Sequence, residues 1–214
     1  MVRSPSLLPL GDCFADRAGL TAHDGRLLMG DSVLVAWPPE LLRALHQTLK
    51  NECGPVAGTV LHAAGRTYGR SLGQRVSMDL AAHADEALSD LPAAVVQANL
   101  ASYFARLGWG RVEFDFTRFT EGLVEISVTR GPSIAWSEPA VPAADQLLAG
   151  VFAGLFAELS GVELDCLQTD YEVAGTAPAR FIIGLSIRLS QVAKLARQGQ
   201  PHASVVTALE SIRV

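Results

Sequence analysis

The sequence predicts an α+β fold, in which an antiparallel sheet of hairpins packs against a layer of helices. Apolar and polar residues alternate over 112–116 and again over 124–128, and Gly122 lies between the two segments. This pattern is typical of a hairpin with one buried and one wet face. A second pair of strand patterns spans 162–187, with a turn at Gly175. Helical patterns come mainly before the first hairpin, and such grouping favours the α+β class.

Ahead of the hairpins the pattern reads as one strand and three helices. The strand, around 33–35, ends at two prolines, and a helix with a leucine stripe runs from Pro39 to Gly54. A second helix covers 55–73, a polar and acidic connection covers 78–89, and a third helix covers 91–107. We expect the connection to be solvated.

Glycines recur four residues apart on the second helix, at Gly65, Gly69 and Gly73. They share one face, although each costs roughly 1 kcal/mol against alanine in a helix. Such a face allows another backbone or a flat ligand to approach closely. Dense packing in the core and a ligand site both remain open as explanations.

The second half of the chain contains a nearly wholly apolar helix over 143–160, which is normally buried. In the strand after it the alternation changes phase, so we expect a bulge near Cys166. The last strand places Phe181, Ile183, Leu185 and Ile187 on one side. Residues 131–142, with three prolines, read as a surface connection.

We therefore expect one α+β domain over 26–189. Residues 1–25 read as a loosely ordered leader, and 190–214 as a C-terminal tail with a helical pattern. The 214 residues, 49% of them hydrophobic, suffice for one sizeable core.

Composition excludes several classes of protein. The net charge is −5 and the basic residues are scattered, which argues against nucleic-acid binding. No apolar run approaches the roughly 20 residues that span a bilayer, and no secretory signal is evident, so we expect a cytoplasmic protein. The three cysteines, Cys13, Cys53 and Cys166, form no CxxC pair and read as small buried hydrophobes.

Three segments resemble one known family. They are the glycine-bearing helix over 60–70, the Leu-Gly-Trp-Gly entry to a strand over 107–114, and the Gly/Ala/Phe-rich helix over 148–156. Over about residues 40–188 the order of elements is similar to that of the 4-vinyl reductase (hydrocarbon-binding) domain family. That family is related in fold to trafficking-complex subunits and nitric-oxide-sensing domains. The resemblance implies a binding domain for a hydrophobic small molecule.

The chain departs from that family in its last two strands. Members with the full motif carry cysteines there, sometimes viewed as metal ligands, whereas this chain has Tyr171 and Ala179. Neither side chain is a soft ligand for zinc or iron, and Cys166 lies elsewhere in the strand. We therefore expect no metal.

A second, weaker resemblance is to the D component of bacterial cellulose synthase, a ring-forming structural protein. Asn99, the Trp109–Gly110 pair and the run Gly154 to Phe156 would correspond to its features. It implies a homo-oligomeric structural subunit as the alternative function.

No residue set specifies a reaction. The five histidines are not spaced as metal ligands, and no nucleophile elbow, phosphate loop or dinucleotide fingerprint is present. Arg66, Arg70 and Arg75 could hold a carboxylate, but solvated helix charges explain them equally well. We expect no enzyme, although an accessory role to a reductase stays open.

Aromatic residues are the best candidates for a binding site. Together they could line one apolar space between the sheet and the helices over 55–73 and 143–160. We expect a site for a hydrophobic molecule, such as a tetrapyrrole, an isoprenoid or an aromatic, in a carrier, sensor or assembly factor. Close pairing of Gly/Ala helix faces would make the protein a dimer. The candidate residues are Tyr68, Tyr103, Phe104, Trp109, Phe114, Phe152, Phe156 and Phe181.

Overall fold

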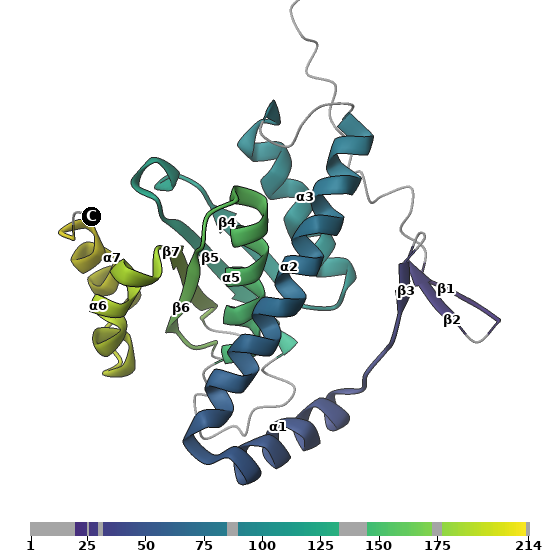
Figure 1. Cartoon of the computed structure of the whole chain (residues 1–214), viewed down its shortest axis with the longest axis horizontal. Coiled ribbons are helices and arrows are strands. Elements are labelled where there is room, and N and C mark those ends of the chain that lie inside the picture. The colour runs from purple at the N-terminus through teal and green to yellow at the C-terminus, as the bar shows by residue number, and fades with distance from the viewer. Residues whose placement is uncertain are drawn as a thin grey trace, which may run out of the picture.

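An antiparallel four-stranded sheet forms the centre of the molecule, in the order β4–β5–β7–β6. The computed structural model describes residues 20–24, 26–29, 32–84, 90–132, 145–172 and 177–212. Helices cover both faces of the sheet, so the body has three layers (Figure 1). The expected α+β class is confirmed. The strands are β4 (Arg111–Asp115), β5 (Val124–Thr129), β6 (Asp165–Asp170) and β7 (Ala179–Gly184).

Three helices lie on one face of this sheet. They are α2 (Ala57–Ala84), α3 (Ala93–Arg106) and α5 (Gln146–Ser160). The main apolar core lies between them and the sheet, and α5 is buried along most of its length. Its N-terminus is capped by Asp145, whose Oδ1 accepts a hydrogen bond of 2.9 Å from the Leu148 amide. The expected burial of this helix is confirmed.

Glycines set the distance between α2 and α5. A Cβ atom on Gly65 or Gly69 would overlap the carbonyl oxygens of Leu147 and Val151 on α5. In return, a Cβ on Gly150 or Gly154 would overlap carbonyl oxygens of α2. The two backbones are therefore in contact, as small residues spaced four apart allow. The glycine face of α2 receives another backbone here, so it is closed to a flat ligand and to a second copy of the chain.

The other face of the sheet is covered by α6 (Ser186–Arg197) and α7 (His202–Glu210). They form a second apolar core with the sheet. The expected boundary at residue 189 falls inside α6, and the segment that we expected as a tail is part of the body. The last strand ends at Gly184, so Leu185 and Ile187 do not belong to it. The buried members of this core are Leu123, Ile182, Leu189, Val192, Ala196, Val205, Val206 and Leu209.

Polar contacts fix α7 to the sheet. The buried His202 ring lies 2.7 Å from Glu125 Oε2 through Nε2 and 2.7 Å from Thr169 Oγ1 through Nδ1. At the other end of α7, Glu210 pairs with Arg118. Both ends of the helix are thus tied to neighbouring elements.

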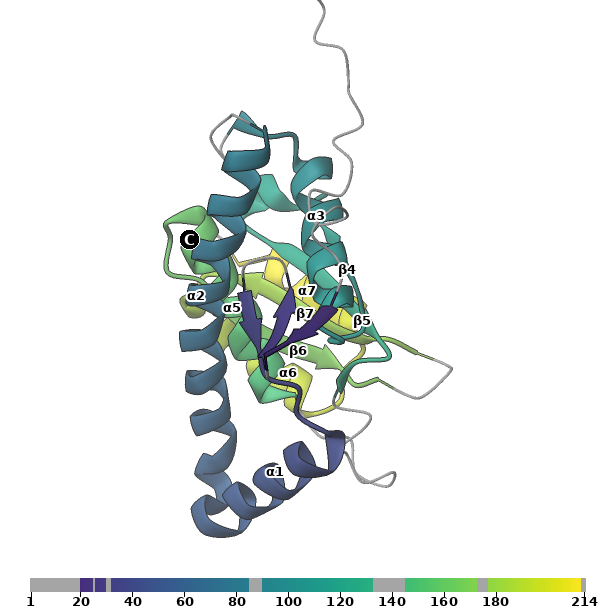
Figure 2. The same ribbon diagram turned by 90° about the vertical axis from the view of Figure 1, so that its right-hand side faces the viewer.

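The N-terminal part forms an arm beside the body. The strands β1 (Leu20–His23), β2 (Arg26–Met29) and β3 (Ser32–Leu34) pair only with one another among the described residues. The helix α1 (Pro39–Cys53) connects this small sheet to α2 (Figures 1 and 2). The sequence predicted one strand here and placed residues 20–23 in a leader. Residues 1–19 lie outside the described part.

Three details of the helices and strands differ from expectation. The helix expected over 55–73 continues to Ala84, because Val76 and Leu80 extend its apolar face into the core. The expected solvated connection over 78–89 is therefore helical as far as the structure describes it. The irregularity in β6 lies between Gln168 and Asp170, beyond the expected bulge near Cys166. None of the side chains of α1 is buried, despite its leucine stripe.

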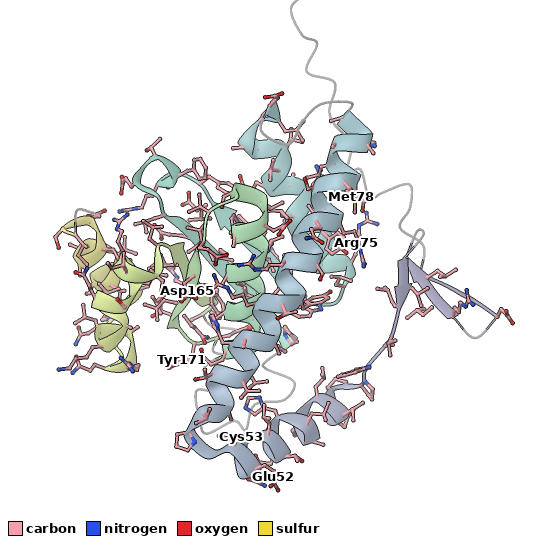
Figure 3. The ribbon with its side chains drawn as sticks, viewed as in Figure 1. Glu52, Cys53, Arg75, Met78, Asp165 and Tyr171 are labelled. Atoms are coloured by element: carbon pink, nitrogen blue, oxygen red, sulfur yellow. The ribbon has the colours of Figure 1, made fainter. Side chains whose placement is uncertain are left out.

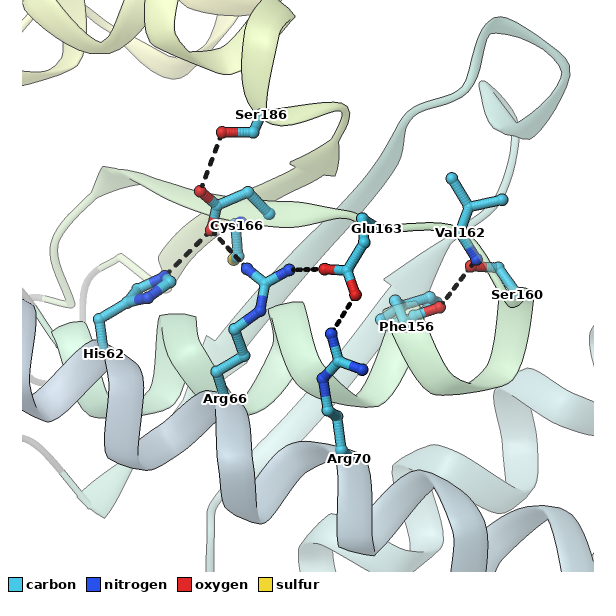
Figure 4. A network of polar contacts seen from close by, with 10 residues as sticks. His62, Arg66, Arg70, Phe156, Ser160, Val162, Glu163, Cys166 and Ser186 are labelled. Atoms are coloured by element: carbon cyan, nitrogen blue, oxygen red, sulfur yellow. Dashed lines mark hydrogen bonds and ion pairs between the residues drawn. The ribbon is translucent and has the colours of Figure 1, made fainter.

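A polar network ties α2 to the start of β6 (Figure 4). His62 Nε2 lies 3.1 Å from Asp165 Oδ1, and Arg66 Nη2 lies 2.5 Å from Glu163 Oε2. Arg70 also binds Glu163. Burial alone would raise the pKa of Asp165, but hydrogen bonds from His62 and the Cys166 amide, with the charge of Arg66, hold it below its ordinary value.

The glycine contact predicts the outcome of two matched alanine substitutions in α2. Gly69→Ala places a methyl group on the backbone of α5, so we expect the free energy of unfolding to fall by about 3 kcal/mol or more. Gly58→Ala meets only Gln146 Cγ, at 3.4 Å, so helix propensity should raise stability by up to about 1 kcal/mol. Urea denaturation followed by circular dichroism measures both. Equal changes in the free energy of unfolding for the two variants would contradict the backbone contact between α2 and α5.

The Asp165 network predicts acid sensitivity. A carboxyl group whose pKa is lowered in the folded state stabilises the protein above its ordinary pKa of 3.8. That contribution is lost as the pH falls through the lower, folded-state value. We expect the difference in thermal midpoint between the native protein and Asp165→Asn to be largest near neutral pH and to shrink below about pH 4. A difference that stays constant down to pH 3 would show that Asp165 acts only through packing.

Candidate functional site

The structure connects seven of the eight aromatic candidates in one ladder of ring contacts, and the eighth, Tyr103, is buried in the same core. Phe152 lies at its centre, with its ring centroid 5.3 Å from those of Phe104 and of Phe181. Phe114 and Phe156 extend the ladder along the sheet, 5.8 Å apart. These five side chains are at most 5% exposed. This part of the expected site is filled by its own side chains, as packed aromatic cores usually are.

The ladder reaches the surface at one end. Trp109 contacts Phe104 edge to face at 6.3 Å and stacks on Tyr68 at 5.9 Å, with 19° between the planes. Trp109 is half-buried and Tyr68 is 42% exposed. We call the group Tyr68, Arg75, Tyr103 and Trp109 the aromatic end. At this end the rings are not fully enclosed by the core.

Local sequence explains how the aromatic end is built. Tyr68, Leu72 and Arg75 follow one another at helical spacing on α2, and Leu72 faces the core. The turn after α3 holds Trp109 between Gly108 and Gly110, which have φ angles of +72° and +91°. A side chain at either glycine would be strained. The Trp109 amide donates a hydrogen bond of 3.0 Å to the Phe104 carbonyl, which turns the indole back toward Tyr68.

Arg75 adds charge to the aromatic end. Its positive charge acts on both Tyr103 and Tyr68. Burial raises the pKa of both tyrosines, and Arg75 opposes the rise. Figure 3 shows Arg75 on the side of α2 away from Asp165. The sequence suggested a joint role for Arg66, Arg70 and Arg75, but Arg66 and Arg70 bind Glu163 across the helix.

Hollows of the described surface lie away from the aromatic end, and two of them are alternative candidates for a site. An apolar groove of about 300 Å³ runs between α1, α2 and the start of α5, and includes Trp37, Leu45 and Leu147. A polar hollow of about 690 Å³ lies on the outer face of β4 and β5, with Glu113, Asp115, Glu125 and His202 in its wall. Three carboxylates line the second hollow, so an apolar ligand there would have to displace water from charged groups.

Neither the polar network around Asp165 nor the buried Cys166 forms a catalytic arrangement. In the network of Figure 4, Asp165 bridges His62 and Ser186, so the histidine does not contact the hydroxyl group that it would have to activate. Burial raises the pKa of the Cys166 thiol, which makes it a weak nucleophile. No three His, Cys, Asp or Glu side chains in the described part of the chain are grouped to hold a metal. No described helix is long and apolar enough to cross a membrane.

Comparison with known proteins supports the fold and does not assign a family. No family model matches the chain, and no curated protein matches it. The structure is similar to the crystal structure of the phenol-responsive sensory domain of the transcription activator PoxR with phenol. The TM-score is 0.65 at 14% identity, over 92% of this chain and 98% of that one.

Two further solved structures overlap less well. One is a vinyl-4-reductase family protein from Methanocaldococcus jannaschii, with a TM-score of 0.45 and 14% identity over 70% of this chain and 82% of that one. The other is trafficking protein particle complex subunit 3 from Naegleria fowleri covalently bound to palmitic acid, with a TM-score of 0.47 and 14% identity over 69% and 95%. These overlaps are too small to carry an inference. The likeness to the PoxR domain shows that the two chains share a fold.

Proposed function

We infer that this protein is a binding module for a small hydrophobic molecule, which it contacts at the aromatic end, and that it acts by binding without catalysis. The observation that carries the proposal is the continuous ladder of rings from the buried core to the half-exposed Tyr68–Trp109 pair. Flat apolar surface beside a polar group is what small-molecule sites commonly offer.

The stacked pair is the part of the ladder that can yield to a ligand. Outward rotation of the Tyr68 ring would open a space between it and Trp109 for a ligand ring, while the deeper rings are held on all sides by the core. A small ring placed there gains stacking contacts without opening a cavity in the packed interior. The site would therefore favour a molecule the size of a single ring over a tetrapyrrole or a long isoprenoid.

The similar fold supports the same kind of role. The PoxR sensory domain, which covers nearly the whole of this chain, is phenol-responsive and was crystallised with phenol. A shared fold does not fix a function, so the proposal depends on the residues of the aromatic end. A cytoplasmic sensor or carrier is the form of protein that we expect, and its output stays a prediction.

Titration calorimetry with phenol as the probe tests the proposal. We expect Trp109→Ala and Tyr68→Ala to weaken phenol binding by about tenfold each, because each removes one face of the stack. Trp37→Ala, which changes an exposed tryptophan in the other apolar hollow, should leave the affinity unchanged. Phe152→Ala is unsuitable, since loss of that fully buried ring should destabilise the fold by about 3–5 kcal/mol.

Two results would contradict the proposal. One is unchanged phenol affinity in both Trp109→Ala and Tyr68→Ala while Trp37→Ala abolishes binding. The other is a native protein that binds no phenol and no other single-ring aromatic compound, and is found by native mass spectrometry as a bare oligomer above a dimer. That second result would favour the alternative of a structural, ring-forming protein.

A further inference from the structure

We propose that the ligand of the aromatic end is a small aromatic acid, with its ring on the Tyr68–Trp109 pair and its carboxylate bound by Arg75. This inference rests on the proposed function and names the ligand class. A site of this kind would prefer an aromatic acid to a neutral hydrocarbon.

The first step is the position of Arg75 on α2. Arg75 follows Tyr68 by seven residues, or about two helical turns, so the two side chains share a face. The buried Leu72 between them points that face toward the core. The positive charge of Arg75 acts on Tyr68, which stacks on Trp109, and on Tyr103. The guanidinium and the stacked rings therefore belong to one site.

The second step is the division of the arginines of α2 between two sides. Arg66 and Arg70 are bound to Glu163, two residues before β6 begins. Arg75 follows Arg66 by nine residues, about two and a half turns, which places it on the opposite side of the helix. The carboxylates of β6 therefore do not reach it. A cation on the aromatic side is in place for an anion brought by a ligand.

The third step is the match of chemistry and exposure. Arg75 is exposed, whereas the Tyr103 ring is buried and Trp109 is half-buried. Exposure therefore decreases from Arg75 to the rings. A molecule with an apolar ring and a charged end fits this arrangement, because its ring leaves water while its charge stays near the surface. Guanidinium is well suited to carboxylate, since it can donate two parallel hydrogen bonds.

Asp79 opposes this binding. It lies one turn beyond Arg75 on the same face of α2, and its negative charge also acts on Tyr103. Asp79 should therefore weaken the attraction for an anion without removing it. Removing the charge of Asp79 should tighten binding of an anion, whereas removing the charge of Arg75 should weaken it. A general loss of structure would weaken binding in both variants.

The experiment compares benzoate with benzamide on the full chain by titration calorimetry at neutral pH. The two probes have the same ring and similar shape, and differ in charge. We expect benzoate to bind about tenfold more tightly than benzamide, as a charge-assisted hydrogen bond implies. Arg75→Gln should remove that preference, while Arg75→Lys should keep part of it. Asp79→Asn should tighten benzoate binding alone.

Arg197→Gln is the matched control, because it removes an exposed arginine from α6, on the far side of the sheet. It should change neither affinity. The ligand class is wrong if benzamide and benzoate bind alike and Arg75→Gln alters neither, whereas the proposed function still stands in that case. If neither probe binds and phenol does not bind either, the binding function itself fails.

Discussion

The contact between the backbones of α2 and α5 is the constraint on which the rest of the structure depends. Because glycines on both helices leave no room for side chains, α2 is held directly on α5, and α5 is held on the sheet. The contact fixes both sides of α2 at once. One side presents Arg66 and Arg70 to Glu163, and the other presents Tyr68 and Arg75 to the aromatic end.

This arrangement explains how a densely packed protein can still offer a site. The buried phenylalanines support one another and the sheet, so they act as a rigid wall. The pair at the surface, Tyr68 and Trp109, lacks that enclosure on one side. At the proposed site, a ligand would therefore bind without opening the core, and the charge of Arg75 at the rim would select among similar rings.

Local patterns predicted the α+β class, both hairpins and α5, because alternation and apolar spacing report burial on one or two faces. They did not predict that the C-terminal segment packs on the sheet. Ile182 is buried on the second face of the sheet by α6 and α7, and this contact between distant segments leaves no local pattern. The aromatic set was identified from composition, yet spacing could not separate the filled core around Phe152 from the open end at Tyr68. The separation of Arg75 from Arg66 follows from helical periodicity and was available in the sequence.

Two-dimensional NMR of the tryptophan indole N–H groups during addition of phenol tests the central claim most directly. Trp109 lies in the aromatic end and Trp37 in the apolar groove beside α1, so their signals report on two different sites. A saturable shift of the Trp109 signal, with the Trp37 signal unmoved, is the result that we expect. A shift confined to Trp37, or no shift of either signal at millimolar phenol, would contradict a binding site at the aromatic end.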